Sequence, residues 1–348
     1  MNFRDIARLR MVNQQLTHPD FTKSADLVQW MGCIQAQDFG AAKWAIGARI
    51  KGITHSEVES DYNEGNILRT HILRPTWHFV AREDIRWILK LTAGKVRTFC
   101  RNYYRRLGIE DADLKKSNKI FQRELKGGLQ LTRTELKGFL TKEKIDASDI
   151  RMGFHLMDAE LDGILCSGER KGKQFTYALL EDRAPSGKSF EAEDAVRELT
   201  KRYFQSRGPA SLKDFCWWSG FSVKNALAGI EMNARKLICE TIDGQEYWFF
   251  KPERIVKRDS IHFLPVYDEY AVGYHDRSAI LDPEHHTSTG HGIFRPVIVH
   301  NGRIAGIWKK SEKKGRTNIK KEIFSSPGRL SAASIKKAEK NYEQFLTG

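Results

Sequence analysis

The spacing of apolar residues along the chain predicts groups of helices, each followed by a short β hairpin. In the first group the apolar positions recur with a period of about 3.6 residues, which is typical of amphipathic helices. These helices are expected at about 3–15, 24–34 and 40–50. After one more short helix, two β-like runs at 67–73 and 76–80 meet at a Pro-containing turn. Helices followed by a hairpin is the order of a winged helix-turn-helix unit, in which the hairpin is the wing.

The same order of elements recurs twice further along the chain. Helices are expected at 117–126, from 131 onward and at 151–162, and the hairpin at 163–180. After a linker at 184–187, helices are expected near 191–206, 211–219 and 222–234, and a third hairpin at 236–250. The third hairpin turns at Asp243-Gly244 and is less basic than the second, so we expect it to serve packing. The nearly equal spacing of two copies indicates a tandem repeat.

The pattern changes at about 254 to short β runs separated by turns. Strands are expected at 261–266, 293–300 and 303–308, with a turn at Asn301-Gly302 and a closing helix at 333–346. We therefore predict an α+β, predominantly helical fold with three tandem winged helix-turn-helix units and a small C-terminal β barrel or sheet. The predicted domains are 1–115, 116–183, 188–252 and 253–348, the first including the helices that follow its hairpin.

Charge and composition narrow the class of protein. Lys and Arg number 58 against 44 Asp and Glu, which leaves a net charge of +14. This excess favours a polyanionic partner such as nucleic acid, although a basic protein with a merely solvated surface remains an alternative. No apolar run approaches the roughly 20 residues that span a bilayer. The five cysteines are odd in number and never form a C-x-x-C pair. We expect reduced thiols, no structural zinc, no membrane partner and a cytoplasmic, nucleoid-associated location.

The familiar catalytic signatures are absent from the sequence. There is no P-loop, dinucleotide-binding glycine pattern, H-E-x-x-H or G-x-S-x-G. Two groups of residues invite a metal interpretation. The first is a carboxylate cluster that would suit a metal-dependent nuclease: Asp268, Glu269 and Asp276. The second is a set of histidines in a polar loop: His285, His286 and His291. Carboxylates among β turns usually accept backbone hydrogen bonds, and loop histidines usually lie on the surface. We therefore expect no metal and no cofactor.

Gln35 and Gln37 form a short motif whose side chains are suited to catalysis. On a continuous helix they would lie about 200° apart, but in an extended segment residues i and i+2 face the same way. Gly40 suits a helix end, so the pair is expected to converge where the helix at 24–34 ends. A glutamine amide cannot act as a base, but it can orient water and stabilise developing charge. Spacing alone favours a structural polar pair, and the catalytic interpretation stays open beside it.

Two basic stretches suit a phosphate backbone. Arg97, Arg101 and Arg105 recur at i, i+4 and i+8 along a predicted helix, where a solvated helix face is an equal alternative. The tip of the second hairpin carries further cations, Arg170, Lys171 and Lys173. A basic tip on a hairpin that follows helices is what a DNA-contacting wing requires.

Residues 34–38 resemble the Gln-apolar-Gln motif of the AlkZ-type DNA glycosylases, which are bacterial proteins built from tandem winged helices. The related YcaQ-type members carry aspartate at the second position, where this chain has Gln37. The run 68–78 resembles the first wing of the family. The runs 264–270 and 273–278 resemble its C-terminal barrel segment, and 301–308 resembles the strand turn that follows. Together these segments extend the resemblance over nearly the whole chain.

The resemblance implies excision of N-alkylated purines, or unhooking of interstrand crosslinks made through such purines, with Gln35 and Gln37 placing the attacking water. An alkylated purine is cationic and already a good leaving group, so we expect a monofunctional, metal-independent glycosylase. Arg69, His71 and Arg74 in the first hairpin are expected to contact the DNA backbone, with an ordinary exposed hairpin as the alternative.

A second class of function is a non-catalytic winged-helix regulator. A regulator has no evident need for the two amides of Gln35 and Gln37. A protein that recognises operator DNA is usually a two-fold dimer with one winged-helix unit per chain. Three linked units in one chain instead suggest a monomer. The expected partner is double-stranded DNA carrying alkylated bases.

Overall fold

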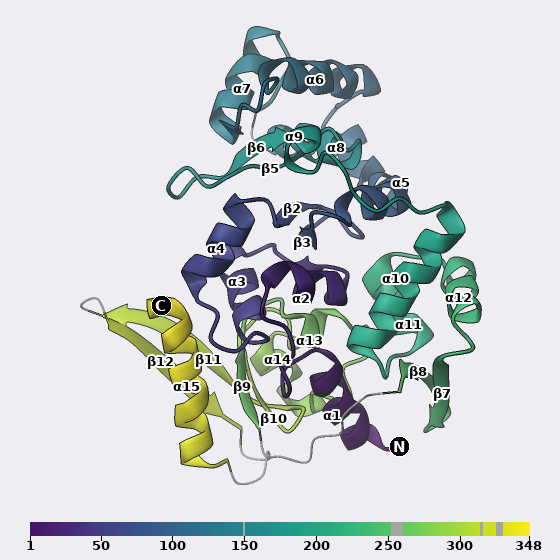
Figure 1. Cartoon of the computed structure of the whole chain (residues 1–348), viewed down its shortest axis with the longest axis vertical. Helices are drawn as coiled ribbons and strands as arrows, with labels where there is room; N and C mark the ends of the chain where they lie inside the picture. The colour runs from purple at the N-terminus through teal and green to yellow at the C-terminus, as the bar shows by residue number, and fades with distance from the viewer. Residues whose placement is uncertain (149, 252–259, 314–315, 325–329) are drawn as a thin grey trace. The chain divides into compact units, whose positions relative to one another are not determined.

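A computed structural model describes residues 1–148, 150–251, 260–313, 316–324 and 330–348 of the chain (Figure 1). Over these residues the fold is mixed, 48% helical and 18% strand, with several small antiparallel sheets. The predicted mixture, in which helix exceeds strand, is confirmed. Within the described ranges no helix is both long and apolar enough to cross a bilayer.

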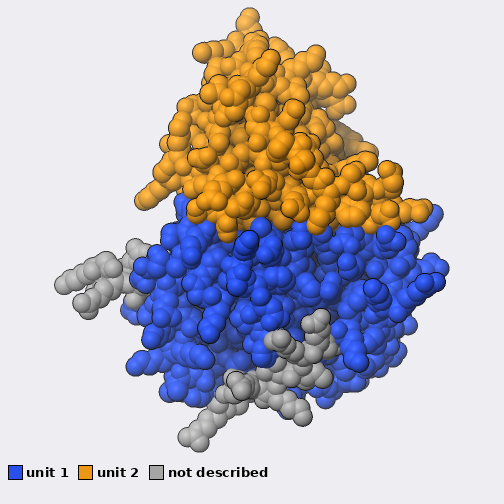
Figure 2. Space-filling model, in the orientation of Figure 1, with its two compact units in different colours: residues 1–59, 196–348 blue, residues 60–195 orange. Residues whose placement is uncertain are grey.

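The chain divides into two compact units (Figure 2). Unit 1 contains residues 1–59 and 196–348, and unit 2 contains residues 60–195. This grouping is coarser than the four predicted domains, and it assigns the two parts of the predicted domain 1–115 to different units. The four-domain division stays a prediction.

Unit 1 begins with the helices on either side of the glutamine motif. In order these elements are α1 (Phe3–Asn13), α2 (Ser24–Met31), β1 (Ile34–Gln35) and α3 (Phe39–Gly47). α2 ends at Gly32, whose φ of 73° lies in the region that favours glycine. Asp38 then starts α3, because its Oδ1 accepts the Ala41 N–H at 2.8 Å. The prediction that Gly40 ends a helix is therefore wrong: Gly40 lies in the first turn of α3.

Unit 2 holds two hairpins and the helices around them. The elements are α4 (His55–Asn63, which begins in unit 1), β2 (Ile67–His71), β3 (Trp77–Ala81), α5 (Ile85–Arg106), α6 (Asp111–Glu124), β4 (Leu131–Thr132), α7 (Arg133–Lys142), α8 (Arg151–Leu161), β5 (Leu165–Ser167), β6 (Thr176–Leu179) and α9 (Leu180–Arg183). α7 starts with a capping box between Thr132 and Glu135, which confirms the helix predicted from 131 onward. The predicted hairpins at 67–80 and 163–180 are confirmed as β2–β3 and β5–β6.

The rest of unit 1 follows unit 2 in the sequence. Its elements are α10 (Ala192–Arg207, which begins in unit 2), α11 (Leu212–Ser219), α12 (Val223–Met232), β7 (Leu237–Ile242), β8 (Gln245–Phe250), β9 (Ile261–Leu264), α13 (Glu269–Val272), η1 (Pro283–His285), α14 (His286–Thr289), β10 (Val297–His300), β11 (Arg303–Lys313), β12 (Arg316–Ile323) and α15 (Ala332–Thr347). Asp243 and Gly244 at the β7–β8 turn have φ values of 48° and 78°, as the predicted hairpin turn requires.

The C-terminal strands form one antiparallel sheet in the order β12-β11-β10-β9. The turn at Asn301-Gly302 is confirmed by φ values of 49° and 89°. The strand predicted at 303–308 continues to Lys313, and β12 was not predicted at all. β12 is the edge strand of this sheet and its polar residues include Lys320, Lys321 and Glu322, all exposed. A strand with so few apolar residues lacks the alternating pattern on which the prediction depended.

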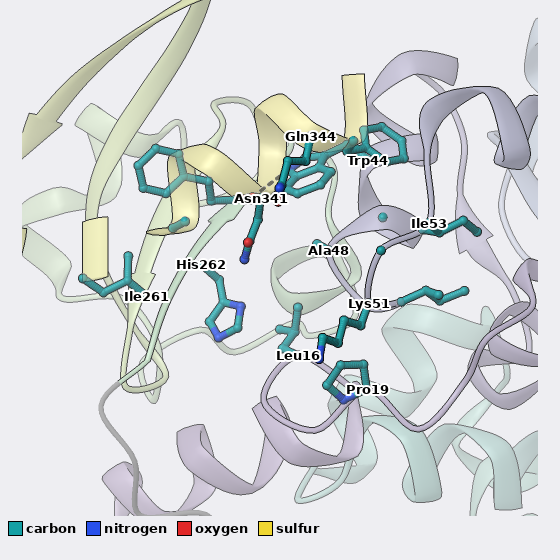
Figure 3. Close-up of a pocket in the computed structure, with 16 residues that line it drawn as sticks. Leu16, Pro19, Trp44, Ala48, Lys51, Ile53, Ile261, His262, Asn341 and Gln344 are labelled. Carbon is teal, nitrogen blue, oxygen red and sulfur yellow. Dashed lines mark hydrogen bonds between the residues drawn. The ribbon is translucent and has the colours of Figure 1, made fainter. Parts of the chain in front are cut away.

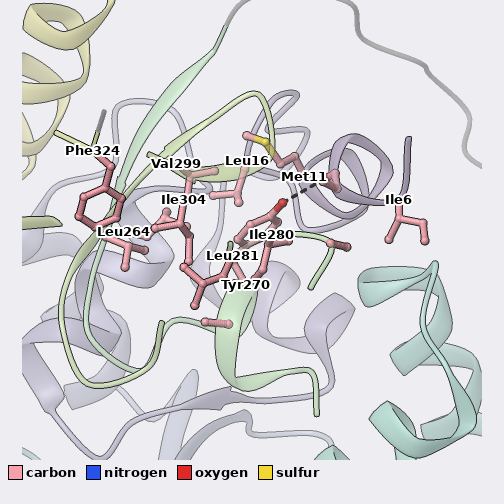
Figure 4. Close-up of a cluster of buried hydrophobic side chains, with 14 of the residues drawn as sticks. Ile6, Met11, Leu16, Leu264, Tyr270, Ile280, Leu281, Val299, Ile304 and Phe324 are labelled. Carbon is pink, nitrogen blue, oxygen red and sulfur yellow. Dashed lines mark hydrogen bonds between the residues drawn. The ribbon is translucent and has the colours of Figure 1, made fainter. Parts of the chain in front are cut away.

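The core of unit 1 joins the first helix to the C-terminal sheet (Figure 4). The hydroxyl of Tyr270 lies 3.0 Å from the carbonyl oxygen of Ala7 in α1 and 2.7 Å from that of Gly302 beside β11. A Cβ at Gly302 would lie 2.8 Å from the backbone of Ala7, so the close approach of α1 requires a glycine there. Packing across these contacts brings the N-terminal segment next to residues 264–304.

Candidate active site and DNA-binding residues

The two glutamines lie on non-helical backbone between α2 and α3. Gln35 ends the short strand β1, and Gln37 precedes Asp38, the N-cap of α3. Ala36 is completely buried, Gln35 is 9% exposed and Gln37 is exposed. The extended conformation expected for this segment is therefore present at Gln35. The functional role of the pair stays a prediction at this point.

A buried ion pair holds the backbone that leads into the motif. The Gln35 N–H donates to Oε1 of Glu269 at 2.8 Å. Arg207 donates to the carbonyl oxygens of Met31 at 2.6 Å and Cys33 at 2.9 Å. Nη2 of Arg207 lies 2.6 Å from Oε2 of Glu269, and both side chains are fully buried. The sequence predicts that Glu269 accepts backbone hydrogen bonds. It does not single out Arg207, because nothing in the local pattern marks the last residue of α10.

The Arg207–Glu269 pair belongs to a larger set of buried charges in unit 1. Arg49 makes two hydrogen bonds to Asp268, at 2.8 and 2.7 Å. Arg10 lies 3.6 Å from Asp214. Burial is the largest single effect and lowers the pKa of the Arg207 guanidinium, but the charge of Glu269, its hydrogen bond to Arg207 and the nearby Cys33 and Tyr274 together raise that pKa above its usual value. The carboxylates of Asp268 and Glu269 therefore each face a buried arginine.

The residues considered for metal binding have other contacts. Asp268 and Glu269 accept hydrogen bonds from the two arginines, and Asp276 accepts the backbone N–H and hydroxyl of Ser278. The ring of His285 stacks on Phe324 with centroids 4.0 Å apart, and the rings of His286 and His291 are 5.9 Å apart. Among the residues that the structure describes, no three His, Cys, Asp or Glu side chains are grouped as a metal site.

Arg69 and His71 of the β2–β3 hairpin are enclosed. Arg69 is 7% exposed, and its guanidinium lies 4.3 Å from the ring centre of Trp77 and 4.6 Å from that of Phe175. Burial lowers the pKa of Arg69. His71 is 6% exposed, with Nδ1 2.5 Å from Glu160. An ordinary exposed hairpin is therefore a wrong description for these two residues.

Arg74, at the turn of the first hairpin, is half-buried. Along α5, Arg97 is half-buried and donates to Asp158 at 3.0 Å and Asp162 at 2.5 Å. Arg101 and Arg105 on the same helix are exposed. The predicted stripe on α5 thus consists of one arginine in ion pairs and two that face solvent.

The tip of the β5–β6 hairpin carries its three predicted cations in two different environments. Arg170 lies over the ring of Phe175 at 4.1 Å and donates to the carbonyl oxygen of Lys173 at 2.7 Å. Lys171 and Lys173 are exposed, and Nζ of Lys171 lies 3.7 Å from Glu135. The ring that Arg170 covers is also contacted by Arg69, so unit 2 brings together residues that the sequence assigned to separate winged units.

Unit 1 also contains a cavity of about 430 Å³ between α3, β9 and α15 (Figure 3). His262, Lys51 and Asn341 point toward this space, and Trp44 lies along its wall. None of the predicted catalytic or DNA-contacting residues lines it.

The whole chain has the fold of a DNA glycosylase. It matches the structure of the Streptomyces sahachiroi DNA glycosylase AlkZ with a TM-score of 0.84 and 22% sequence identity, covering 99% of this chain and 96% of that one. A relative named interstrand DNA cross-link repair glycosylase, from the same organism, is 23% identical over 334 residues and 88% of each chain is covered. The family described as DNA glycosylase AlkZ-like matches residues 28–345. The chain belongs to the AlkZ-like DNA glycosylase family, which confirms the resemblance found in the sequence.

Proposed function

We propose that this protein is a DNA repair glycosylase that hydrolyses the N-glycosidic bond of N-alkylated, cationic purines in double-stranded DNA. The observation that carries the proposal is the pair Gln35 and Gln37 on the non-helical backbone between α2 and α3 in a member of the AlkZ-like DNA glycosylase family. The name of the Streptomyces sahachiroi relative supports extending the substrates to purines joined in interstrand crosslinks.

The chemistry needs little from the protein because the base is activated by alkylation. When the bond between C1′ and the base nitrogen breaks, its electron pair neutralises the positive charge of the purine. The sugar becomes oxocarbenium-like, and water adds at C1′ with loss of a proton. The amides of Gln35 and Gln37 are suited to hold this water, since each has an acceptor oxygen and a donor nitrogen. Positioned side chains of this kind typically contribute about 10²–10⁴-fold to a rate. No general acid and no metal enter the proposal.

We further propose that residues 1–115, 116–183 and 188–252 are winged-helix units and that 253–348 is a C-terminal β domain. The hairpins β2–β3, β5–β6 and β7–β8, each preceded by helices, support this division.

The proposed phosphate contacts come from the cations on α5 and on the two hairpins of unit 2. Exposure supports a direct role for Arg101, Arg105, Lys171 and Lys173. The half-buried Arg74, Arg97 and Arg170 are proposed as further phosphate contacts. Because Arg69 and His71 are enclosed, we assign them to shaping the first hairpin.

The proposal is tested by base release from duplex DNA containing N7-methylguanine, detected by mass spectrometry. Gln35→Ala and Gln37→Ala are each expected to slow release by about 100-fold or more, while the affinity for DNA persists. Gln245→Ala is a matched control because it makes the same chemical change at an exposed position on β8, and its rate should equal that of the wild type.

The alternative is a non-catalytic winged-helix DNA-binding regulator. Tight binding without release from either the N7-methylguanine duplex or a crosslinked duplex would establish this alternative. Release that is equally fast in both glutamine variants would keep the glycosylase and reject the motif as its catalytic centre.

A further inference from the structure

We infer that Arg207 and Glu269 are positioning residues for the reaction, because they set the backbone from which Gln35 presents its amide. The inference rests on the proposed function. The contacts that carry it are made to backbone atoms: Glu269 accepts the N–H of Gln35, and Arg207 donates to the carbonyl oxygens of Met31 and Cys33.

The contacts fall on every second residue of the segment that leads to Gln35. Arg207 donates to the carbonyl oxygens of Met31 and Cys33, and Glu269 accepts the N–H of Gln35. The last carbonyl groups of a helix lack partners within the helix, and a cation near them is favoured by the helix dipole. Met31 is the last residue of α2, so Arg207 both completes the end of this helix and directs the chain out of it.

The ion pair is itself held on several sides. Oε2 of Glu269 accepts from Nε of Arg207 at 3.0 Å, from Nη2 at 2.6 Å and from Nε1 of Trp218 at 3.1 Å. The Arg207 guanidinium lies 4.5 Å from the ring centre of Trp218 and donates to the hydroxyl of Ser206 at 2.8 Å. These contacts leave Oε1 of Glu269 directed at the Gln35 N–H. Hydrogen bonds that involve a charged group are short and strong, so the pair is a rigid support.

Stability alone does not require these two residues. A buried ion pair is weak evidence for stability, since apolar residues of similar volume often serve as well or better. Apolar residues cannot accept the Gln35 N–H or donate to the two carbonyl groups. A displacement of reacting groups by about 1 Å can cost about 10²-fold in rate. The function that we assign to the Arg207–Glu269 pair is therefore to hold the Gln35 backbone in place.

The test compares Glu269→Gln and Arg207→Lys with the wild type. The first removes the carboxylate charge but keeps an acceptor; the second keeps the positive charge but loses the planar, multiple donors of arginine. We expect single-turnover release of N7-methylguanine to fall about 10-fold or more, with the dissociation constant for DNA within about two-fold of the wild type. Hydrogen–deuterium exchange of peptides covering 31–38 should become faster in both variants.

Leu281→Ala is the control for a general loss of stability. Leu281 is 1% exposed in the core of unit 1 and belongs to a cluster that does not include the motif. It should destabilise unit 1 without changing the release rate of folded protein or the exchange of 31–38 relative to the rest of unit 1.

Three results would overturn the inference. They are unchanged exchange of 31–38 in both variants, faster exchange there with an unchanged release rate, and an effect in Leu281→Ala as large as in the two test variants. If the wild type releases no base, the proposed function fails and catalytic positioning fails with it. The exchange measurement then still tests the structural part of the inference by itself. Faster exchange confined to 31–38 would support the anchoring of this segment by Arg207 and Glu269, and unchanged exchange would reject the anchoring as well.

Discussion

The buried pair between Arg49 and Asp268 offers a test of the energetics of unit 1. Arg49 is 0% exposed and Asp268 is 2% exposed. The guanidinium also donates to the carbonyl oxygen of Ala45 and to the side chain of Gln14, both at 2.9 Å. Arg49→Met removes all four hydrogen bonds and leaves a buried carboxylate whose observed remaining donor is the Tyr270 N–H at 2.8 Å.

The expected loss in the free energy of unfolding is about 3–5 kcal/mol, the cost of removing one member of a buried pair. Most of this cost comes from the uncompensated carboxylate and not from the attraction that is lost. The double variant Arg49→Met, Asp268→Asn no longer buries that charge. Its loss should therefore be smaller than the sum of the two single losses by about 1–3 kcal/mol, a coupling of the size seen for residues in direct contact.

Urea unfolding followed by tryptophan fluorescence measures this loss, because all the tryptophans except Trp77 and Trp87 lie in unit 1. Lys201→Met is the control: Lys201 lies 3.3 Å from Glu198, its side chain is 46% exposed, and such surface pairs contribute about 0–1 kcal/mol. A loss below about 1 kcal/mol for Arg49→Met, or fully additive losses in the double variant, would refute the reasoning.

Three further predictions concern binding, pH and chemistry. If six or more phosphates are contacted, affinity for duplex DNA should fall about 10³-fold or more between 50 and 200 mM salt, and Lys171→Ala with Lys173→Ala should reduce the slope of log affinity against log salt by about two; a flat response would contradict DNA binding through phosphates. The pKa of His262 is lowered from 6.5 to about 4, mainly by burial and secondly by the charge of Arg49, while the charge of Asp268 opposes this shift. The unfolded chain therefore takes up the proton first, and stability should fall as pH drops from about 6.5 toward 4, by about 2 kcal/mol at pH 5. His262→Asn should remove that part of the pH dependence in urea unfolding, and an unchanged profile would show that His262 is not its source. Base release should persist in EDTA and be absent for uracil or unmodified bases, since only cationic bases leave without help; loss of release in EDTA, or comparable release of uracil, would reject the proposed chemistry.

Local patterns along the chain were enough to predict most of its elements. The helix predicted at 151–162 is α8, Arg151–Leu161, and the hairpin turns at Asp243-Gly244 and Asn301-Gly302 lie where they were expected. These features depend on the periodicity of apolar residues and on turn residues that tolerate positive φ, both of which are properties of neighbouring residues. The prediction failed where the local signal was absent or ambiguous, at the polar edge strand β12 and at Gly40.

By itself, the sequence determined the family of this protein, the order of its helices and hairpins, and the position of the Gln35–Gln37 motif. Only the tertiary structure placed Glu269 against the Gln35 N–H across a separation of 234 residues, and Arg207 against Glu269 across 62. It also placed Arg69 and Arg170 over the same ring of Phe175. The physical reason is that an arginine at a helix end has the same local pattern whether it faces water or is buried. Only the packing of distant segments decides which charges are buried, and a buried charge must then find its partner in those segments.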